Sequence, residues 1–125
     1  MSWKIIENYR HILAAEKGSV VKGWGGKLTV CLIYPNHYRT GMSNLGFQAV
    51  YALFNDHYDV VCERAFLPER DELPEYRISR TPLLSLESQK PLADFDVLAF
   101  SVSFETDYLN IPVILSLARI PCYAS

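Results

Sequence analysis

The fold is decided by one stretch of the chain, Leu28-Thr29-Val30-Cys31-Leu32-Ile33-Tyr34, in which nearly every residue is apolar. A strand with one face in water alternates between apolar and polar residues, whereas a strand covered on both faces by helices is apolar almost throughout. The stretch therefore predicts a central strand of a parallel sheet.

Further strands are expected on either side of this one in space. Residues 59–66 read as a second strand, 83–86 as a short third strand, and 96–103 as a fourth strand that is again nearly continuously apolar. The connection over 67–80 is charged and contains two prolines, which suggests a loop with a short helix.

Helices are expected between these strands. Residues 45–54 have helical spacing, and we expect the helix to lie on the sheet through Leu45, Ala49, Ala52 and Leu53, with Phe47, Val50 and Phe54 widening that face. A last helix is expected from about residue 107 to 119, with Pro112 in its first turn. The alternation predicts an α/β fold with three layers, a Rossmann-like (flavodoxin-like), doubly wound and mainly parallel sheet.

The chain divides into two expected parts. Residues 1–26 combine an amphipathic helix, in which Trp3, Ile6, Tyr9 and Leu13 recur and which we expect Gly18 to end, with a glycine-rich arm. Residues 27–125 form the α/β domain. Because a doubly wound sheet would place another strand at about residues 120–123, we expect the sheet to be truncated at its C-terminal edge.

Composition excludes several classes of protein. Half of the 125 residues are apolar, which suits one domain with a buried core. The formal charge is -2 without a cluster of basic residues, so nucleic acid is not an expected partner. No apolar run reaches membrane-spanning length and no signal peptide is present, so we expect a soluble, cytoplasmic protein. Cys31, Cys62 and Cys122 match neither a disulfide framework nor a metal site, and buried thiols are expected.

Common catalytic motifs are missing from the sequence. It contains no Gly-x-x-x-x-Gly-Lys phosphate loop, no Gly-x-Gly-x-x-Gly fingerprint and no Gly-x-Ser-x-Gly nucleophile elbow. A phospho-acceptor regulator would need an acidic pair for magnesium after the first strand, and residues 34–36 supply none. We therefore predict no self-sufficient catalytic constellation in this chain.

Ligands of parallel sheets bind beyond the carboxyl ends of the strands, and three segments qualify. Residues 35–44 form the most polar loop, in which we expect Gly41 to give backbone freedom and Ser43 to cap the next helix; the alternative is an ordinary turn in which Asn36 and Ser43 satisfy backbone donors. Residues 101–107 carry two serine hydroxyls and two carboxylates that could bind a ligand; the alternative is that Thr106 or Asp107 only caps a helix. Residues 64–70 more often form a solvated rim.

Four ordered segments carry a resemblance to a known family. Residues 31–46, 61–68, 86–96 and 100–105 are similar to radical S-adenosylmethionine (radical SAM) proteins that have an N-terminal cobalamin-binding-like domain. The resemblance covers the chain from about Ser19 onward. It implies that the radical SAM catalytic domain of the same full-length chain is the partner of this domain.

The resemblance makes cobalamin a possible cofactor. Cobalamin domains carry Asp-x-His-x-x-Gly after the first strand, the histidine being the lower axial ligand of cobalt. Aligned on Gly41, this chain has Asn36 in place of the aspartate and Tyr38 in place of the histidine, and its own His37 is displaced by one position. The residues expected to line the cofactor are Asn36, His37, Tyr38, Arg39, Thr40, Gly41, Ser43, Ser101, Ser103 and Glu105.

Catalysis by the family depends on parts that this chain lacks. The iron-sulfur cluster and S-adenosylmethionine are bound through a Cys-x-x-x-Cys-x-x-Cys motif of a separate barrel-like domain, and the three cysteines here do not have that spacing. We therefore expect the full-length protein, not this chain alone, to be a radical SAM enzyme.

Three hypotheses for the role of the domain stay open. The first is that it holds a corrinoid or a substrate near the iron-sulfur site. The second is a cofactor-free scaffold or interaction module of the same fold. The third is an independent enzyme that uses His37, Glu105 and Asp107 as acids and bases, which requires these side chains to converge.

Overall fold

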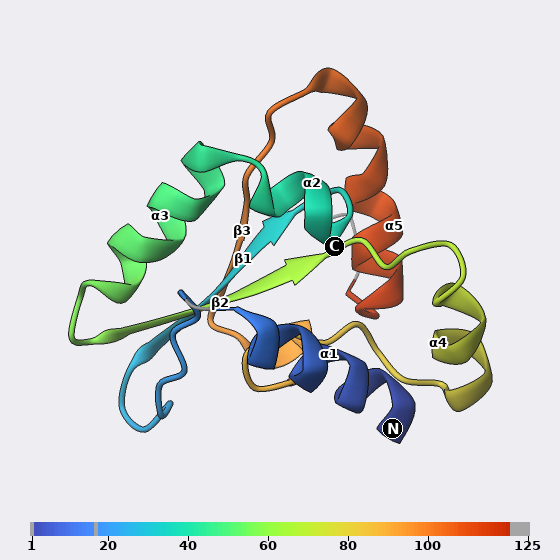
Figure 1. The fold of residues 1–125 in the computed structure, drawn as a ribbon, viewed down its shortest axis with the longest axis horizontal. Helices are drawn as coiled ribbons and strands as arrows, with labels where there is room; N and C mark the ends of the chain where they lie inside the picture. The colour runs from blue at the N-terminus through green and yellow to red at the C-terminus, as the bar shows by residue number, and fades with distance from the viewer. Residues whose placement is uncertain (1, 17, 121–125) are drawn as a thin grey trace.

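A computed structural model describes residues 2–16 and 18–120 of the chain. Its sheet contains β1 (Leu28–Tyr34), β2 (Val60–Phe66) and β3 (Val97–Phe100) in the order β2-β1-β3, and both pairings are parallel (Figure 1). Only Leu28 is exposed in the central strand β1, as expected for a strand with helices on both faces. The prediction of an α/β fold with an open parallel sheet is confirmed.

Helices connect and flank the strands. The α-helices are α1 (Trp3–Ala15), α2 (Tyr38–Met42), α3 (Leu45–Asn55), α4 (Leu73–Ser79) and α5 (Ile111–Leu117), and the 3₁₀ helices are η1 (Leu92–Asp94) and η2 (Glu105–Asn110). No helix among the described residues is both long enough and apolar enough to cross a bilayer.

The core lies in two layers, one on each face of the sheet. Successive β1 residues point to opposite faces, so Cys31 and Ile33 contribute to one cluster and Val30 and Leu32 to the other. The first cluster is completed by Ile5 of α1, Tyr76 of α4, Leu92 of η1, Ile114 of α5 and Ala118, which follows α5 directly. The second is completed by Phe47 and Tyr51 of α3. These layers place the loops at the carboxyl ends of all three strands along one edge of the sheet.

Two strand predictions need correction. Residues 83–86 do not form a strand, and Leu84 makes only an isolated bridge with Pro91. Leu83, Leu84 and Leu86 are buried, but their backbone forms no continuous ladder: the amide of Leu83 bonds to the carbonyl oxygen of Leu117 after β3, and the amide of Leu86 makes a single bond to the carbonyl oxygen of Arg64 in β2. The strand predicted over 96–103 is β3, which ends at Phe100 because the chain then turns into η2.

Three helix predictions also need correction. Leu45 and Leu53, expected on the sheet, are 80% and 64% exposed, and the buried residues of α3 are Phe47, Tyr51 and Asn55. Bulky Phe47 and Tyr51 fill the space over the sheet, so the helix is rotated relative to the predicted face. Helix α1 ends at Ala15, before the glycine expected to stop it. The last helix starts as η2, with Pro112 in the first turn of α5 as predicted.

Residues 64–70 were expected to form a solvated rim, and Glu69 and Arg70 are indeed exposed, but the charged residues of β2, Glu63 and Arg64, are buried. The Arg64 side chain is 2% exposed, and its Nε donates to Glu87 Oε2 at 2.6 Å while Nη2 donates to Glu16 Oε1 at 2.7 Å. Tyr51 donates its hydroxyl to the same Glu87 oxygen at 2.7 Å. Burial raises the pKa of Glu87 above its ordinary value, although Arg64 opposes this change.

Helix α3 begins at an asparagine cap rather than at Ser43. Asn44 Oδ1 accepts from the backbone amide of Phe47 at 2.9 Å, whereas Ser43 Oγ donates to the carbonyl oxygen of Arg39 at the end of α2. Asn44 is the N-cap because the helical backbone of α3 starts at Leu45, one residue later than expected from Gly41 and Ser43.

Replacing Asn44 with alanine is expected to lower the free energy of unfolding by about 1 kcal/mol, because the amide of Phe47 loses its acceptor. Urea unfolding followed by circular dichroism measures the change. Ser43→Ala is the matched control and should lose clearly less. Equal losses in the two variants would restore Ser43 as the cap.

Candidate functional site

The candidate site is the region between the loops that follow β1 and β3, which we call the crevice after its position in the sheet topology. The chain leaves β1 through α3 on one face of the sheet and reaches β3 through α4 and η1 on the other, so the direction of winding reverses between β1 and β3. In open α/β sheets the two loops at such a switch point generally diverge, and ligands bind between them. In Figure 1 these loops lie at the end of the sheet that carries α2.

Asn36 connects the two loops. Its Oδ1 accepts from the backbone amide of His37 at 2.7 Å, and its Nδ2 donates to Asp107 Oδ1 at 3.2 Å. The Asn36 carbonyl oxygen also accepts from the amide of Leu67, at 2.9 Å, in the loop after β2. This residue is therefore fixed by the ends of both neighbouring strands.

Two further bonds cross the crevice. Asn44 Nδ2 donates to Ser103 Oγ at 2.8 Å, and Asn110 Nδ2 donates to the carbonyl oxygen of Pro35 at 2.8 Å. Ser101, also predicted for the site, extends the pairing of β3 with β1, because its amide donates to the Ile33 carbonyl oxygen at 2.9 Å. The two polar loops thus meet, and their polar groups bind each other.

His37 and Tyr38 point away from this crevice. His37 Nδ1 lies 3.0 Å from the carbonyl oxygen of Leu67 and 3.7 Å from Glu69 Oε2, so the ring lies on the β2 side. Because a carbonyl oxygen only accepts, Nδ1 is the donor in the bond to Leu67. The Tyr38 hydroxyl donates to Glu16, and its ring packs edge-on against Phe66. Burial raises the pKa of Tyr38, and the bond to Glu16 raises it further.

The other predicted site residues have varied surroundings. Arg39, Thr40, Ser43, Ser103 and Glu105 are exposed. Gly41 is buried and does not have a positive φ, so close packing rather than backbone freedom explains the glycine. A Cβ at this position would lie 2.6 Å from Cε1 of Phe66.

Asp107 is the most buried polar residue of the crevice and was not among the predicted cofactor-lining residues. It is 1% exposed, and within the described residues its Oδ2 has no hydrogen-bond partner. No local motif identifies this role, because Asn36, the partner of the Asp107 side chain among the described residues, is far away in sequence. Among the described residues, His37 bonds to Leu67 and Asp107 to Asn36, and no hydrogen bond joins His37, Glu105 and Asp107 to one another.

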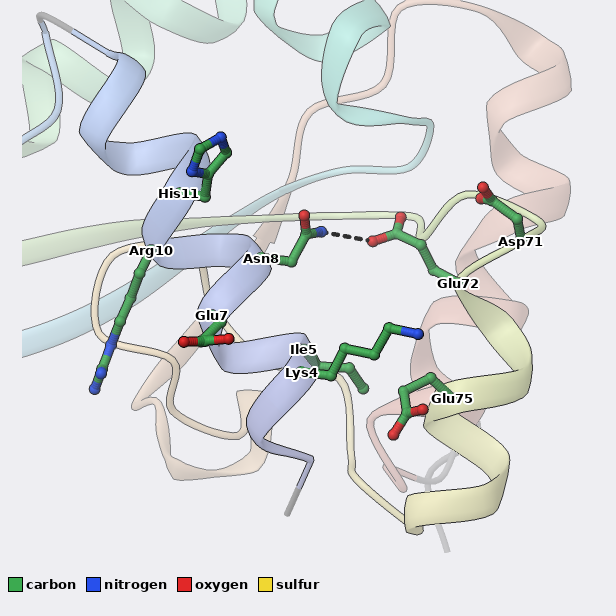
Figure 2. Close-up of a pocket in the computed structure, with 9 residues that line it drawn as sticks. All are labelled: Lys4, Ile5, Glu7, Asn8, Arg10, His11, Asp71, Glu72 and Glu75. Carbon is green, nitrogen blue, oxygen red and sulfur yellow. Dashed lines mark hydrogen bonds between the residues drawn. The ribbon is translucent and has the colours of Figure 1, made fainter.

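Two cavities lie outside the crevice. A wide groove of about 800 Å³ separates α1 from α4, and Figure 2 shows Asn8 donating to Glu72 across it at 3.0 Å. Its charged lining residues are Lys4, Glu7, Arg10, Asp71, Glu72 and Glu75. A second cavity, beneath Tyr9, Tyr38 and Phe66, measures about 40 Å³ and has room for little more than a water molecule.

Metal ligands are not gathered anywhere in the described part of the chain, where no three side chains of His, Cys, Asp or Glu form a cluster suited to an ion. Cys31 and Cys62 are buried free thiols in opposite core clusters. Burial raises the pKa of Cys62 to about 12 and that of Cys31 well above its ordinary value, so both thiols stay protonated. Cys122 lies outside the described residues.

Comparison with known proteins places the chain in a family. A family model for the N-terminal region of radical SAM proteins matches residues 46–125, well over half of the chain. It contains three of the four segments that carried the resemblance, and the polar loop after β1 precedes it. Searches of curated proteins and of solved structures find no match. The chain therefore belongs to the family of radical SAM protein N-terminal regions.

Proposed function

We propose that this accessory domain of a radical SAM protein acts as a scaffold for the catalytic domain without holding a corrinoid. The observation that carries the proposal is the set of three side-chain bonds across the switch point: Asn36 to Asp107, Asn44 to Ser103 and Asn110 to Pro35. A ligand bound there would have to replace these bonds with its own. The hydrogen bonds between the two loops instead make the carboxyl end of the sheet rigid.

The residues present do not fit a corrinoid held by a protein axial ligand. Tyr38, at the position of the usual histidine, is a protonated phenol bonded to Glu16 on the β2 side. The Nδ1 atom of His37 bonds to the carbonyl oxygen of Leu67, so the ring lies beyond the end of β2 rather than between β1 and β3. Asn36, at the position of the aspartate that orients the axial histidine, is bonded to Asp107.

One feature of the crevice supports the corrinoid hypothesis instead. Asp107 Oδ2 could accept a hydrogen bond from an amide of the corrin ring, because the described residues offer it no donor. Asp107 is 1% exposed, however, and a ligand would reach it only after the loops had separated. This favours the scaffold and makes corrinoid binding the alternative that an experiment must test.

Radical chemistry in the proposed arrangement belongs to the catalytic domain. The two described cysteines are buried apart from each other, so they supply no cluster ligands. The contribution of this domain is to present a fixed rim of exposed polar groups, such as Arg39, Thr40 and Glu105, toward the catalytic domain or its substrate.

Titrating the full-length radical SAM protein with hydroxocobalamin is expected to leave the corrinoid absorbance spectrum unchanged, because neither candidate ligand faces the switch point. Absorbance and equilibrium dialysis measure binding. A saturable spectral shift with one equivalent would favour the corrinoid hypothesis. His37→Ala would then identify the ligand, with His57→Ala, at an exposed histidine, as the matched control.

A further inference from the structure

Helix α3 has an exposed apolar face on the side opposite to the sheet. Phe47 and Tyr51 face the sheet and are buried. Leu45, Ala49 and Leu53 recur at four-residue spacing on the other side of the helix, and Leu45 and Leu53 are 80% and 64% exposed. In Figure 1, α3 forms the left margin of the fold, and no other helix or strand is drawn beyond it. We name Leu45, Ala49 and Leu53 the α3 ridge.

The composition of α3 is typical of a helix that is covered on all sides. No charged residue occurs from Asn44 to Asn55. A helix that borders water normally has a polar outer face, whereas a helix that is apolar all round is buried. The side that its pattern predicts to contact the sheet is the exposed one, because Phe47 and Tyr51 fill the space over the sheet instead. The α3 ridge therefore has the composition of a contact surface.

The α3 ridge is symmetric about its central residue. Leu45 and Leu53 lie four residues before and four residues after Ala49. When two copies of α3 cross antiparallel at Ala49, Leu45 of each copy faces Leu53 of the other, which is the self-complementarity that a two-fold interface requires. An alanine at the crossing point lets the two helix axes approach to about 8 Å. Because α3 carries no charge, this pairing brings no like charges together.

Two exposed aromatic residues extend the apolar surface at the ends of the helix. Phe104, 62% exposed, lies beside the start of α3, because the preceding Ser103 accepts a hydrogen bond from Asn44 at 2.8 Å. Tyr58, 85% exposed, follows the end of α3. In an antiparallel pair the start of one helix lies beside the end of the other, so Phe104 of one copy comes near Tyr58 of the other copy.

The size of this surface predicts a weak association. Helix α3 has 11 residues and is therefore about 17 Å long. A pair of such helices buries less than the roughly 800 Å² per partner of a standard stable interface. The contact is consequently expected to form and dissociate in the micromolar range rather than to be permanent.

We infer that α3 is the contact surface of a homodimer, in which the α3 ridges of two copies pack antiparallel around a two-fold axis near Ala49. The symmetry of the ridge favours a second copy over the catalytic domain, because a surface of a different domain does not require a pattern centred on Ala49. The inference rests on α3 and its two ends and is independent of whether the crevice holds a corrinoid.

Sedimentation equilibrium of the full-length radical SAM protein tests the dimer. We expect a monomer–dimer equilibrium with a dissociation constant of about 1–100 µM. Ala49→Glu places two carboxylates at the two-fold axis and is expected to raise this constant at least about 100-fold. Ala14→Glu, at an exposed alanine of α1, is the matched control and should leave the constant unchanged. A protein that stays monomeric at about 500 µM would overturn the inference, as would a dimer that Ala49→Glu leaves intact.

Thermal unfolding of the monomer separates the homodimer from coverage by the catalytic domain. At a concentration where the full-length protein is monomeric, Ala49→Glu and Ala14→Glu should have similar Tm values, because the ridge is then exposed. A Tm that is lower by about 4 °C or more in Ala49→Glu alone would overturn the inference in favour of an interdomain contact.

Crosslinking tests the antiparallel geometry. A mixture of the full-length Leu45→Cys and Leu53→Cys proteins should yield more dimer with a short bis-maleimide than either variant alone, because residues 45 and 53 face each other across the axis. The unsubstituted protein is the control for its own cysteines. Crosslinking of each variant only with itself would indicate parallel helices and contradict the two-fold arrangement.

Discussion

Replacing Arg64 with methionine will lower the free energy of unfolding by about 3–5 kcal/mol, because it leaves buried carboxylates without their cation. The side chains of Arg64 and Glu87 are 2% and 0% exposed. Glu16, the second carboxylate, is 11% exposed and binds both Nη atoms of Arg64. The Arg64 guanidinium also lies 4.5 Å from the centre of the Tyr51 ring, so its loss removes a cation-π contact as well.

Two comparisons separate this effect from a general loss of packing. Arg39→Met removes an exposed arginine of α2 and should change stability by no more than about 0.5 kcal/mol. The double variant Arg64→Met/Glu87→Gln removes the uncompensated charge and should regain part of the loss. Urea unfolding gives all three values. A loss for Arg64→Met that matches the loss for Arg39→Met would show that the pair contributes nothing.

The loss in Arg64→Met should depend on pH. Without Arg64, burial is no longer opposed by a cation, so the pKa of folded Glu87 rises further above the unfolded value of about 4.3. If the pKa of a carboxyl group is higher in the folded than in the unfolded state, the free energy of unfolding falls as the pH rises from the unfolded-state pKa to the folded-state pKa. The difference from the unsubstituted chain should therefore be largest at neutral pH and smaller near pH 4. A constant difference would indicate lost packing instead of an uncompensated charge.

The parts of the fold that could be predicted are those with a signal in the local sequence. Residues 28–34 are apolar at nearly every position because both faces of β1 are covered, and this identified the central parallel strand. The same signal failed for residues 83–86. Those residues are just as buried, but the partners of their backbone groups, Arg64 and Leu117, are set by the tertiary structure.

Buried charge was the feature that sequence could least reveal. Glu63 and Arg64 in β2 have the composition of a surface strand, yet they are 1% and 2% exposed. Glu63 accepts from Trp24, Ser85 and Ser88, none of which is near it in sequence. These buried charges are stable because residues of the N-terminal arm and of the connection before β3 form hydrogen bonds with them. The local sequence around β2 does not indicate those hydrogen-bond partners.

The candidate site shows the same division. The rule that ligand loops follow strand ends correctly placed residues 35–44 and 101–107 beside each other. The individual hydrogen bonds could not be predicted. The acceptors of Asn36, Asn44 and Asn110 lie across the crevice, and the geometry of the loops determines which acceptor each side chain reaches. The sequence also could not predict which way the side chains of His37 and Tyr38 point. A shift of one residue at the start of α2 changes which strand end a side chain faces.

Replacing Gly41 with alanine will lower the free energy of unfolding by about 2 kcal/mol, although alanine is the better helix former by about 1 kcal/mol. Gly41 lies inside α2, and an added Cβ would lie 2.6 Å from Cε1 of Phe66 and 3.2 Å from Cβ of Tyr34. Phe66 cannot move freely, because its ring is packed between Tyr38 and Phe47.

Gly23→Ala is the matched control for this variant, since a Cβ at residue 23 meets no described atom within 4 Å. Its stability should equal that of the unsubstituted chain or exceed it slightly, because the unfolded state loses conformational freedom. Urea unfolding of both variants decides between two roles for Gly41. A loss at Gly41 alone means that α2, and with it the loop that carries Asn36 and Asn44, is held in place by close contact with β1 and β2. A gain at both positions would mean that the loop can move away from the sheet, and the crevice between β1 and β3 could then open to admit a ligand.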